Sequence, residues 1–172
     1  MEQNPSRREF LQAGLMLPAA GLVSTRGSQT SLSNPPGVAY RTLGKTGIKV
    51  TGVGCGAGGV PDPVILARAY DLGVNYFDTA RIYGGGKSEQ ILGKFLEGKR
   101  QKIILASKTY SNTREKILQD IETSLKTLGT DYLDVYHQHS RHTPQEITDE
   151  MIETMDLVKK QGKCRFIGVS TH

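Results

Sequence analysis

Short apolar segments alternate along the chain with longer segments in which apolar residues recur at helical spacing. The short segments have the length and residue types of β-strands. They span residues 52–55, 75–79, 103–108, 132–139 and 165–170. Each of the first four is followed by a helical pattern, so the sequence predicts βαβ units and a parallel sheet.

Residues that favour helix ends bound the first two predicted helices. Asp62 is expected to cap the first helix, Pro63 to open it and Gly73 to end it. Ser88 is expected to cap the second helix, which carries apolar residues on one face.

The third and fourth predicted helices show similar signals. Asn112 and Glu115 have the spacing of a capping box, and Gly129 ends the pattern that follows. Residues 143–146 read Thr-Pro-Gln-Glu and predict the start of the fourth helix, which Gly162 ends. Ahead of all these elements, residues 40–43 and 48–51 flank the turn sequence 44–47 and predict a small β-hairpin.

The N-terminal sequence resembles a twin-arginine export signal. Arg7 and Arg8 are followed by Phe10 and Leu11 and then by a mostly apolar stretch over residues 11–23. Such a stretch is too short to cross a bilayer but long enough for a signal sequence. We expect residues 1–36 to be this signal and a flexible leader, recognised by the export machinery, and the mature domain to be periplasmic; the alternative is a cytoplasmic chain with a frayed basic tail.

Composition and charge narrow the class of protein. The 172 residues include 22 Lys and Arg against 17 Asp and Glu, a net charge of +5. The basic residues are scattered and are not interleaved with aromatic residues, so we expect no nucleic-acid partner. Cys55 and Cys164 are too few for a disulfide scaffold and are expected to stay unpaired. The chain is also shorter than the roughly 250 residues that a closed eight-stranded (β/α) barrel usually takes.

A glycine-rich segment matches the dinucleotide-binding pattern in form. Residues 54–59 satisfy GxGxxG, and Asp78 follows at about the expected distance. That motif needs a helix to start within the glycines, however, and Pro61 and Pro63 delay the helix. A Rossmann-type dehydrogenase is therefore the less favoured reading.

Two other motifs are also weak. Residues 86–88 read Gly-Lys-Ser, as at the end of a phosphate-binding loop, but Arg81 occupies the position of that loop's first glycine. His137 and His139 share one face of a strand, yet no third ligand follows at a later strand end. We expect no metal site and predict that His137 is packed beneath the functional site.

Four polar residues form a more informative constellation. Asp78, Lys108 and His139 each end a predicted strand, and Tyr83 lies in the loop that follows Asp78. The carboxyl ends of parallel strands share one edge, where barrel enzymes place their active sites. A tyrosine beside an ammonium that a carboxylate holds in place can donate a proton, and an imidazole can orient a carbonyl group.

These residues lie within segments that resemble the N-terminal part of an aldo-keto reductase. The segments are residues 40–47, 76–80 with 83–84 and 88–89, 106–108, 128–139 and 167–170. The resemblance implies an incomplete (β/α)8 TIM barrel, strands 1 to 5 with an N-terminal hairpin, over residues 37–172.

The resemblance also implies a reaction and the residues that perform it. The expected reaction is the NADPH-dependent reduction of an aldehyde or ketone to an alcohol. Tyr83 would be the general acid, Lys108 its pKa partner, Asp78 the anchor of the lysine and His139 the group that orients the carbonyl. Asp78, Ser170 and Thr171 would contact the cofactor, although Thr171 replaces the Asn that is usual in the family.

Family fold and chain length together predict that most of the cofactor site lies outside these 172 residues. We expect a truncated reductase with little turnover of its own. The alternative is a non-catalytic remnant or interaction module that does not bind the cofactor. Substrate identity, oligomeric state and the choice between NADP and NAD stay open.

Overall fold

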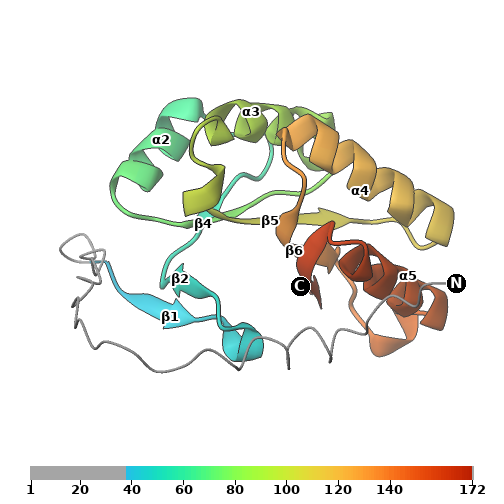
Figure 1. Cartoon of the computed structure of the whole chain (residues 1–172). Helices are drawn as coiled ribbons and strands as arrows, with labels where there is room; N and C mark the ends of the chain where they lie inside the picture. Colours follow the sequence, from blue (N-terminus) through green and yellow to red (C-terminus); the bar gives the residue numbers. More distant parts are fainter. Residues whose placement is uncertain (1–37, 172) are drawn as a thin grey trace, which may run out of the picture. The chain divides into compact units, whose positions relative to one another are not determined.

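The computed structural model describes residues 38–171. The predicted export signal and leader lie outside the described residues. Two sheets are present in residues 38–171: an antiparallel pair, β1–β2, and a five-stranded sheet in the order β3-β4-β5-β6-β7 (Figure 1). All neighbouring strands of the larger sheet are parallel.

Each strand of the larger sheet overlaps one of the five predicted segments, although β3 overlaps its segment, 52–55, only at Cys55. They are β3 (Cys55–Gly56), β4 (Tyr76–Asp78), β5 (Ile104–Thr109), β6 (Leu133–Gln138) and β7 (Cys164–Val169). Their spatial order follows their order in the sequence, whereas a doubly wound sheet reverses direction at a switch point. The Rossmann-type alternative is therefore excluded for the described residues.

The four predicted helices are present, but three of them start at residues other than those predicted. They are α2 (Pro63–Asp71), α3 (Lys87–Leu96), α4 (Arg114–Leu128) and α5 (Asp149–Lys160). Short 3-10 turns occupy Gly44–Thr46 (η2), Tyr83–Gly86 (η3), Arg100–Lys102 (η4) and Pro144–Glu146 (η5). The first helix starts as predicted, since the Asp62 side chain accepts a hydrogen bond from the Val64 amide.

Ser88 is not the cap of α3. The helix begins at Lys87, after Gly86, which is two residues earlier than a Ser88 cap would give. The Ser88 hydroxyl is buried against the carbonyl oxygen of Ala57 and the hydroxyl of Thr79. Its hydroxyl therefore satisfies polar groups of neighbouring segments rather than the amides of its own helix.

The predicted caps of α4 and α5 are also wrong. Thr113, not Asn112, precedes α4, and the Arg114 amide at its start donates to Glu150 of α5 at 2.9 Å. Thr143 precedes the separate turn η5, and α5 begins later, where the Thr148 hydroxyl accepts from the Met151 amide. A contact between helices thus replaces the local cap at α4, whereas α5 has a local cap five residues after the predicted one.

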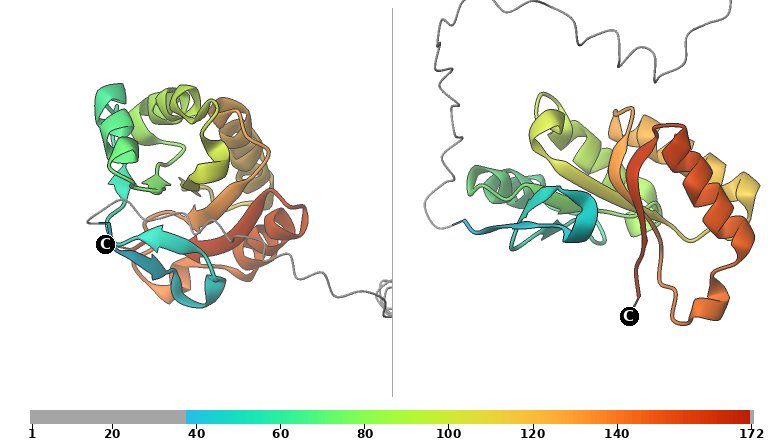
Figure 2. Two further views of the ribbon diagram at one scale, coloured as in Figure 1. Left: turned by 60° about the vertical axis from the view of Figure 1, so that its left-hand side comes forward. Right: turned by 60° about the horizontal axis from the view of Figure 1, so that its bottom comes forward.

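The helices lie along the outer face of the curved sheet (Figure 2). Side chains from alternate strand positions, such as Phe77, Leu105 and Tyr136, are fully buried and form one apolar core with the inner sides of the helices. The opposite face carries the intervening residues, including Asp78, Lys108 and His137. The sheet therefore has one face covered by the helices and a second face that carries the ion pair of Asp78 and Lys108.

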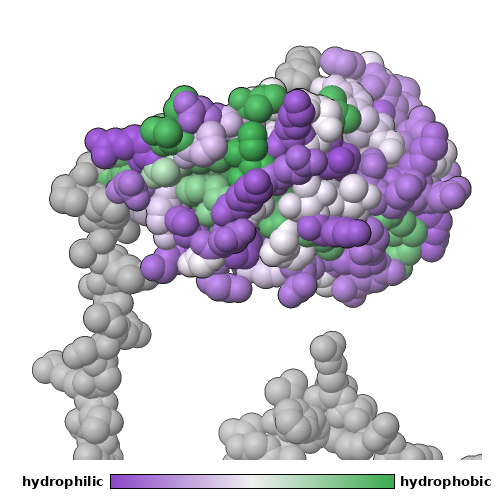
Figure 3. All heavy atoms as spheres, turned by 90° about the horizontal axis from the view of Figure 1, so that it is seen from above, coloured by the Kyte–Doolittle hydropathy of each residue, from purple (hydrophilic) through white to green (hydrophobic). Residues whose placement is uncertain are grey.

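The outer surface of the helices is mixed in character. Seen from above α2 and α3, hydrophilic residues dominate the α4 side, and hydrophobic residues gather towards α2 (Figure 3). Val64 and Ile65 of α2 are 73% and 62% exposed. Within residues 38–171 no helix is both long and apolar enough to cross a membrane.

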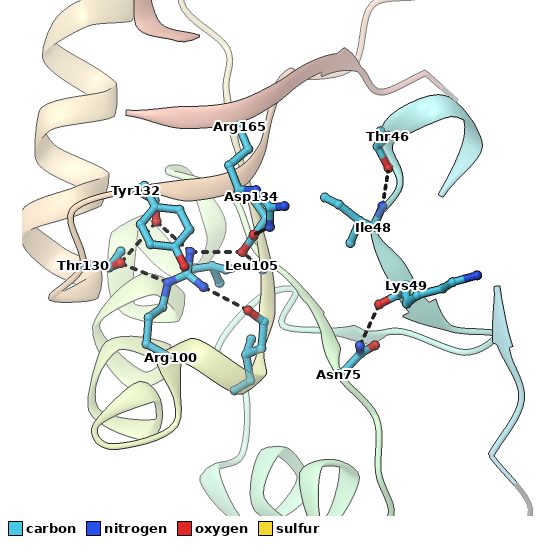
Figure 4. Close-up of polar contacts among 11 residues, drawn as sticks. Thr46, Ile48, Lys49, Asn75, Arg100, Leu105, Thr130, Tyr132, Asp134 and Arg165 are labelled. Atoms are coloured by element: carbon cyan, nitrogen blue, oxygen red, sulfur yellow. Dashed lines mark hydrogen bonds and ion pairs between the residues drawn. The ribbon is translucent and has the colours of Figure 1, made fainter. Parts of the chain in front are cut away.

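The hairpin of β1 (Tyr40–Thr42) and β2 (Lys49–Thr51) is tied to the segment before β4. The Asn75 side chain accepts from the Thr51 amide at 2.8 Å. It also donates to the Lys49 carbonyl oxygen at 2.9 Å (Figure 4). Tyr40 donates from its hydroxyl to the Gly73 carbonyl oxygen at 3.1 Å. Polar contacts thus fix the hairpin beside the amino-terminal end of β4.

A charged cluster joins the amino-terminal ends of β5, β6 and β7 (Figure 4). Asp134 of β6 is 1% exposed and pairs with Arg100 at 3.0 Å and with Arg165 at 2.7 Å. It also accepts from the Leu105 amide at 2.9 Å. Arg100 also stacks on the ring of Tyr132. The contacts of Asp134 thus link β5, β6 and β7 at the end opposite the predicted site.

Candidate active site

The four residues predicted from strand ends meet at the carboxyl edge of the sheet. Asp78 ends β4, Lys108 lies one residue before the end of β5, and His139 directly follows β6. Tyr83 begins the turn η3 after β4. Parallel pairing brings these ends side by side, because Asp78 is opposite Ala106 and Lys108 is opposite His137.

Lys108 is the centre of this arrangement. Its ammonium group forms an ion pair with Asp78 and donates to the Thr79 carbonyl oxygen at 2.8 Å. The same nitrogen lies 5.0 Å from the centre of the Tyr83 ring. Lys108 is only 6% exposed, so its charge is held close to the phenol with little screening by water.

His139 approaches Tyr83 from the next strand. The Tyr83 hydroxyl oxygen is 3.5 Å from Nε2 of His139, and the two rings meet edge to face with centres 5.5 Å apart. His139 is 3% exposed. A carbonyl oxygen placed next to both groups could accept hydrogen bonds from the phenol and the imidazole together.

Glycines give the Tyr83 turn its shape. Gly84 and Gly85 adopt positive φ angles of 56° and 65° inside η3. A Cβ atom on Gly84 would lie 2.5 Å from the carbonyl oxygen of Gly59. The glycine-rich segment 54–59 therefore packs against the turn that carries Tyr83, and close backbone packing explains at least part of its composition.

A buried ion pair supports the same turn. Glu89 of α3 is fully buried, contacts the guanidinium of Arg81 and accepts from the Ser107 hydroxyl at 2.8 Å. Gly86 makes room for this pair, since a Cβ atom there would lie 2.6 Å from Arg81. The position of Tyr83 is thus fixed by α3 and β5 as well as by its own turn.

A second tyrosine, Tyr76, lies near the site. Tyr76 lies two residues before Asp78 on β4, so its side chain is on the same face of the sheet. Burial, reinforced by Asp78 and Asp134, raises the pKa of Tyr76 to about 12. Tyr76 therefore holds its proton strongly and is the poorer acid candidate.

Ser170 and Thr171, the predicted cofactor contacts, follow β7 at the same edge. The Ser170 hydroxyl accepts from the Ser140 amide at 2.9 Å, and the Ser170 amide donates to the Gln138 carbonyl oxygen at 2.9 Å. Because its oxygen accepts from Ser140, the Ser170 hydroxyl proton can be donated elsewhere. Thr171 is exposed and offers a second hydroxyl. Hydroxyl groups at these two positions could form hydrogen bonds with a carboxamide group, which both donates and accepts.

His137 lies on the same face as Lys108 and is partly buried. A Cβ atom on Gly168 would lie 2.9 Å from Nδ1 of His137, so the ring rests on the glycine backbone. Burial lowers the pKa of His137; Asp78 opposes this shift and Lys108 adds to it. His137 is thus packed at the level below the site, as predicted. No cluster of three potential metal ligands occurs in residues 38–171.

Sequence reasoning missed Tyr110. Its ring lies against His139 with centres 4.3 Å apart, although Tyr110 itself is 43% exposed. Tyr110 is two residues after Lys108, and this spacing along a strand places both side chains on one face. That alternation was the signal that could have identified it.

Comparison with known proteins agrees with this geometry. Residues 63–172, more than half of the chain, match the aldo/keto reductase family. The chain is 36% identical over 154 residues to L-galactose dehydrogenase of Arabidopsis thaliana, covering 77% of this chain and 48% of the relative. It is also 36% identical over 154 residues to aldo-keto reductase YhdN of Bacillus subtilis, covering 76% of this chain and 46% of the relative. The chain thus spans about half the length of these relatives.

Solved structures show the same relationship. The holo form of aldo-keto reductase AKR11C1 from Bacillus halodurans superposes with a TM-score of 0.73 at 33% identity, over 78% of this chain and 50% of that one. An aldo-keto reductase from Klebsiella pneumoniae in complex with NADPH superposes with a TM-score of 0.65 at 30% identity, over 72% of this chain and 46% of that one. The five parallel strands and four helices are therefore part of the family's TIM barrel, preceded by the hairpin. The chain belongs to the aldo/keto reductase family.

Proposed function

We propose that this chain carries the proton-donating part of the active site of an NADPH-dependent reductase that converts an aldehyde or ketone to an alcohol. The observation that carries the proposal is the placement of the Lys108 ammonium, which is paired with Asp78, 5.0 Å from the centre of the Tyr83 ring. In this place the ammonium stabilises the negative charge that develops on the phenol oxygen as its proton is transferred.

Each residue of the site has a distinct part in this mechanism. Tyr83 donates its hydroxyl proton to the carbonyl oxygen, and the negative charge left on its own oxygen is stabilised by Lys108. Asp78 and the Thr79 carbonyl oxygen hold the ammonium in position. Nε2 of His139, which lies 3.5 Å from the Tyr83 hydroxyl, donates a hydrogen bond that orients the carbonyl group.

The hydroxyls after β7 fit the carboxamide of a nicotinamide cofactor. Ser170 would donate to the carboxamide oxygen while its own oxygen accepts from Ser140. Thr171 provides a second hydroxyl at the same edge. The chemistry that bound NADPH supplies is a hydride for the carbonyl carbon. Support for this cofactor comes from the Klebsiella pneumoniae relative, which was solved in complex with NADPH.

Replacement of the phenol tests the proposal. The chain is joined to the C-terminal half of the Bacillus halodurans reductase, and aldehyde-dependent oxidation of NADPH is measured with Tyr83→Phe. We expect kcat to fall by about 100- to 10,000-fold, the usual contribution of general acid catalysis. The dissociation constant of NADPH, measured by fluorescence titration, should not change, because the phenol does not hold the cofactor.

Tyr76→Phe is the matched control. It removes the same atom from a neighbouring tyrosine whose pKa is raised to about 12, and turnover should be retained. Full activity in Tyr83→Phe, or an equal loss in Tyr76→Phe, would show that Tyr83 is not the acid.

A further inference from the structure

The turn that follows β6 connects three neighbouring strand ends. Ser140 has a positive φ of 50°, an uncommon conformation for a residue other than glycine. The Ser140 and Arg141 amides donate to the hydroxyl and the carbonyl oxygen of Ser170, each at 2.9 Å. The backbone of this turn is therefore anchored on the end of β7, directly after His139.

From that anchored backbone, the Arg141 side chain reaches back over the end of β5. Its Nη2 donates to the Tyr110 carbonyl oxygen at 2.8 Å and to Oε1 of Gln138 at 3.0 Å, and the Ser111 carbonyl oxygen is 3.4 Å away. Gln138 is 2% exposed, so one of the acceptors that hold the guanidinium is itself immobilised. A single side chain thus links the loop after β5 to the turn after β6.

The residue held in this way is the one that covers His139. The Tyr110 ring is 4.3 Å from the imidazole between centres, but 43% of the residue is exposed. Core packing alone does not fix such a ring. On one side, Asp120 of α4 accepts from the hydroxyls of Thr109 and Ser111, the two neighbours of Tyr110. On the other side, Arg141 holds the Tyr110 carbonyl itself.

We propose that Arg141 is a positioning residue, whose guanidinium holds the Tyr110 backbone so that the Tyr110 ring stays against His139, tilted by 42°, and fixes the imidazole facing Tyr83. The inference extends the proposed function, because it assigns the support of the group that orients the carbonyl. Arg141 does not touch the reacting atoms.

The stacking can be measured in the 172-residue chain without any turnover. A proton on an imidazole under an aromatic ring is shifted upfield in the NMR spectrum, and His139→Gln assigns the His139 signal. Tyr110→Ala removes the stacked ring and gives the unstacked reference shift. We expect Arg141→Met to move the His139 signal at least halfway towards that reference, because the Asp120 contacts alone leave the ring free to rotate away.

Controls separate positioning from general damage to the fold. Arg68→Met changes an exposed arginine of α2 and should leave the His139 shift unchanged. In a Tyr110→Ala background, Arg141→Met should cause no further change. Arg141→Lys, which keeps a cation able to donate to the Tyr110 carbonyl, should shift the signal less than Arg141→Met. Arg141→Leu, which also lacks a donor, replaces the methionine variant if that variant does not fold.

The proposal is overturned if a folded variant that lacks a donor at position 141 keeps the parental His139 shift, or if Arg141→Met still moves the signal when Tyr110 is absent. This outcome is independent of the Tyr83 experiment. If Arg141→Met moves the His139 signal as expected and Tyr83→Phe is fully active, the proposed reaction is wrong but the positioning contact still holds.

Discussion

Replacement of Asp134 by alanine should be among the more destabilising single changes in the described residues. The substitution removes three interactions of a carboxylate that is 1% exposed (Figure 4). Loss of the acceptor for the buried Leu105 amide costs about 1–3 kcal/mol. The Arg165 side chain is 49% exposed, so its pair with Asp134 contributes only about 0–1 kcal/mol.

The loss of free energy of unfolding in Asp134→Ala depends mostly on what happens to Arg100. Removal of one partner from a buried pair costs about 3–5 kcal/mol when the remaining charge is left uncompensated. Arg100 keeps three oxygen acceptors, on Thr130, Ile103 and Tyr132, and its stacking on the Tyr132 ring. The charge is therefore partly compensated, and we expect Asp134→Ala to lower the free energy of unfolding by about 3 kcal/mol.

Urea unfolding followed by circular dichroism gives this free energy, with Glu122→Gln as the matched control. Glu122 pairs with Lys163 at the surface, and its side chain is 57% exposed. Loss of that pair should cost about 0–1 kcal/mol. Asp134→Asn, which retains one acceptor oxygen for the Leu105 amide, should fall between the two. If Asp134→Ala lies within about 1 kcal/mol of Glu122→Gln, the cluster does not stabilise the sheet as argued.

Two further predictions concern a glycine and a histidine near the site. Gly86→Ala should lower the free energy of unfolding by about 2–4 kcal/mol, because φ is +90° and the new methyl group would lie 2.6 Å from Arg81. Gly98→Ala is the control: φ is +70° there, nothing lies within 4 Å, and the loss should be only about 1–2 kcal/mol. Equal losses of the two variants in urea unfolding would contradict the steric argument. The pKa of His137 is lowered from 6.5, so below pH 6.5 the unfolded chain binds more protons than the folded chain, and stability should fall as the pH drops through this value. His137→Gln should lose less stability than the parent between about pH 7.5 and pH 5.5, and identical pH profiles would show that His137 does not contribute.

The sequence predicted the strands and the meeting of the four polar residues because both depend on simple periodicity. Alternating side chains and the common direction of parallel strands are enough to bring Asp78, Lys108 and His139 to one edge. Local signals were sufficient where the acceptor belonged to the helix itself, as at Asp62.

Features that depend on distant segments were not predictable in this way. The Ser88 hydroxyl is directed to Ala57 and Thr79, and the α4 amide of Arg114 is directed to Glu150. Such acceptors are known only once the helices have packed. Tyr110 is a different case, because it lies beyond the end of the predicted strand at Lys108 and also beyond the end of β5 at Thr109.

The sequential order of β4, β5 and β6 also has a consequence for biosynthesis. The four residues of the candidate site lie on or after consecutive strands within residues 78–139, and each of β4 to β7 pairs with its immediate predecessor in the chain. Contacts between neighbouring units close short loops and form quickly, and chains fold from the N-terminus as they leave the ribosome. The lysine, its carboxylate and the phenol can therefore come together on the nascent chain as soon as β5 has emerged, and the imidazole joins them one βα unit later.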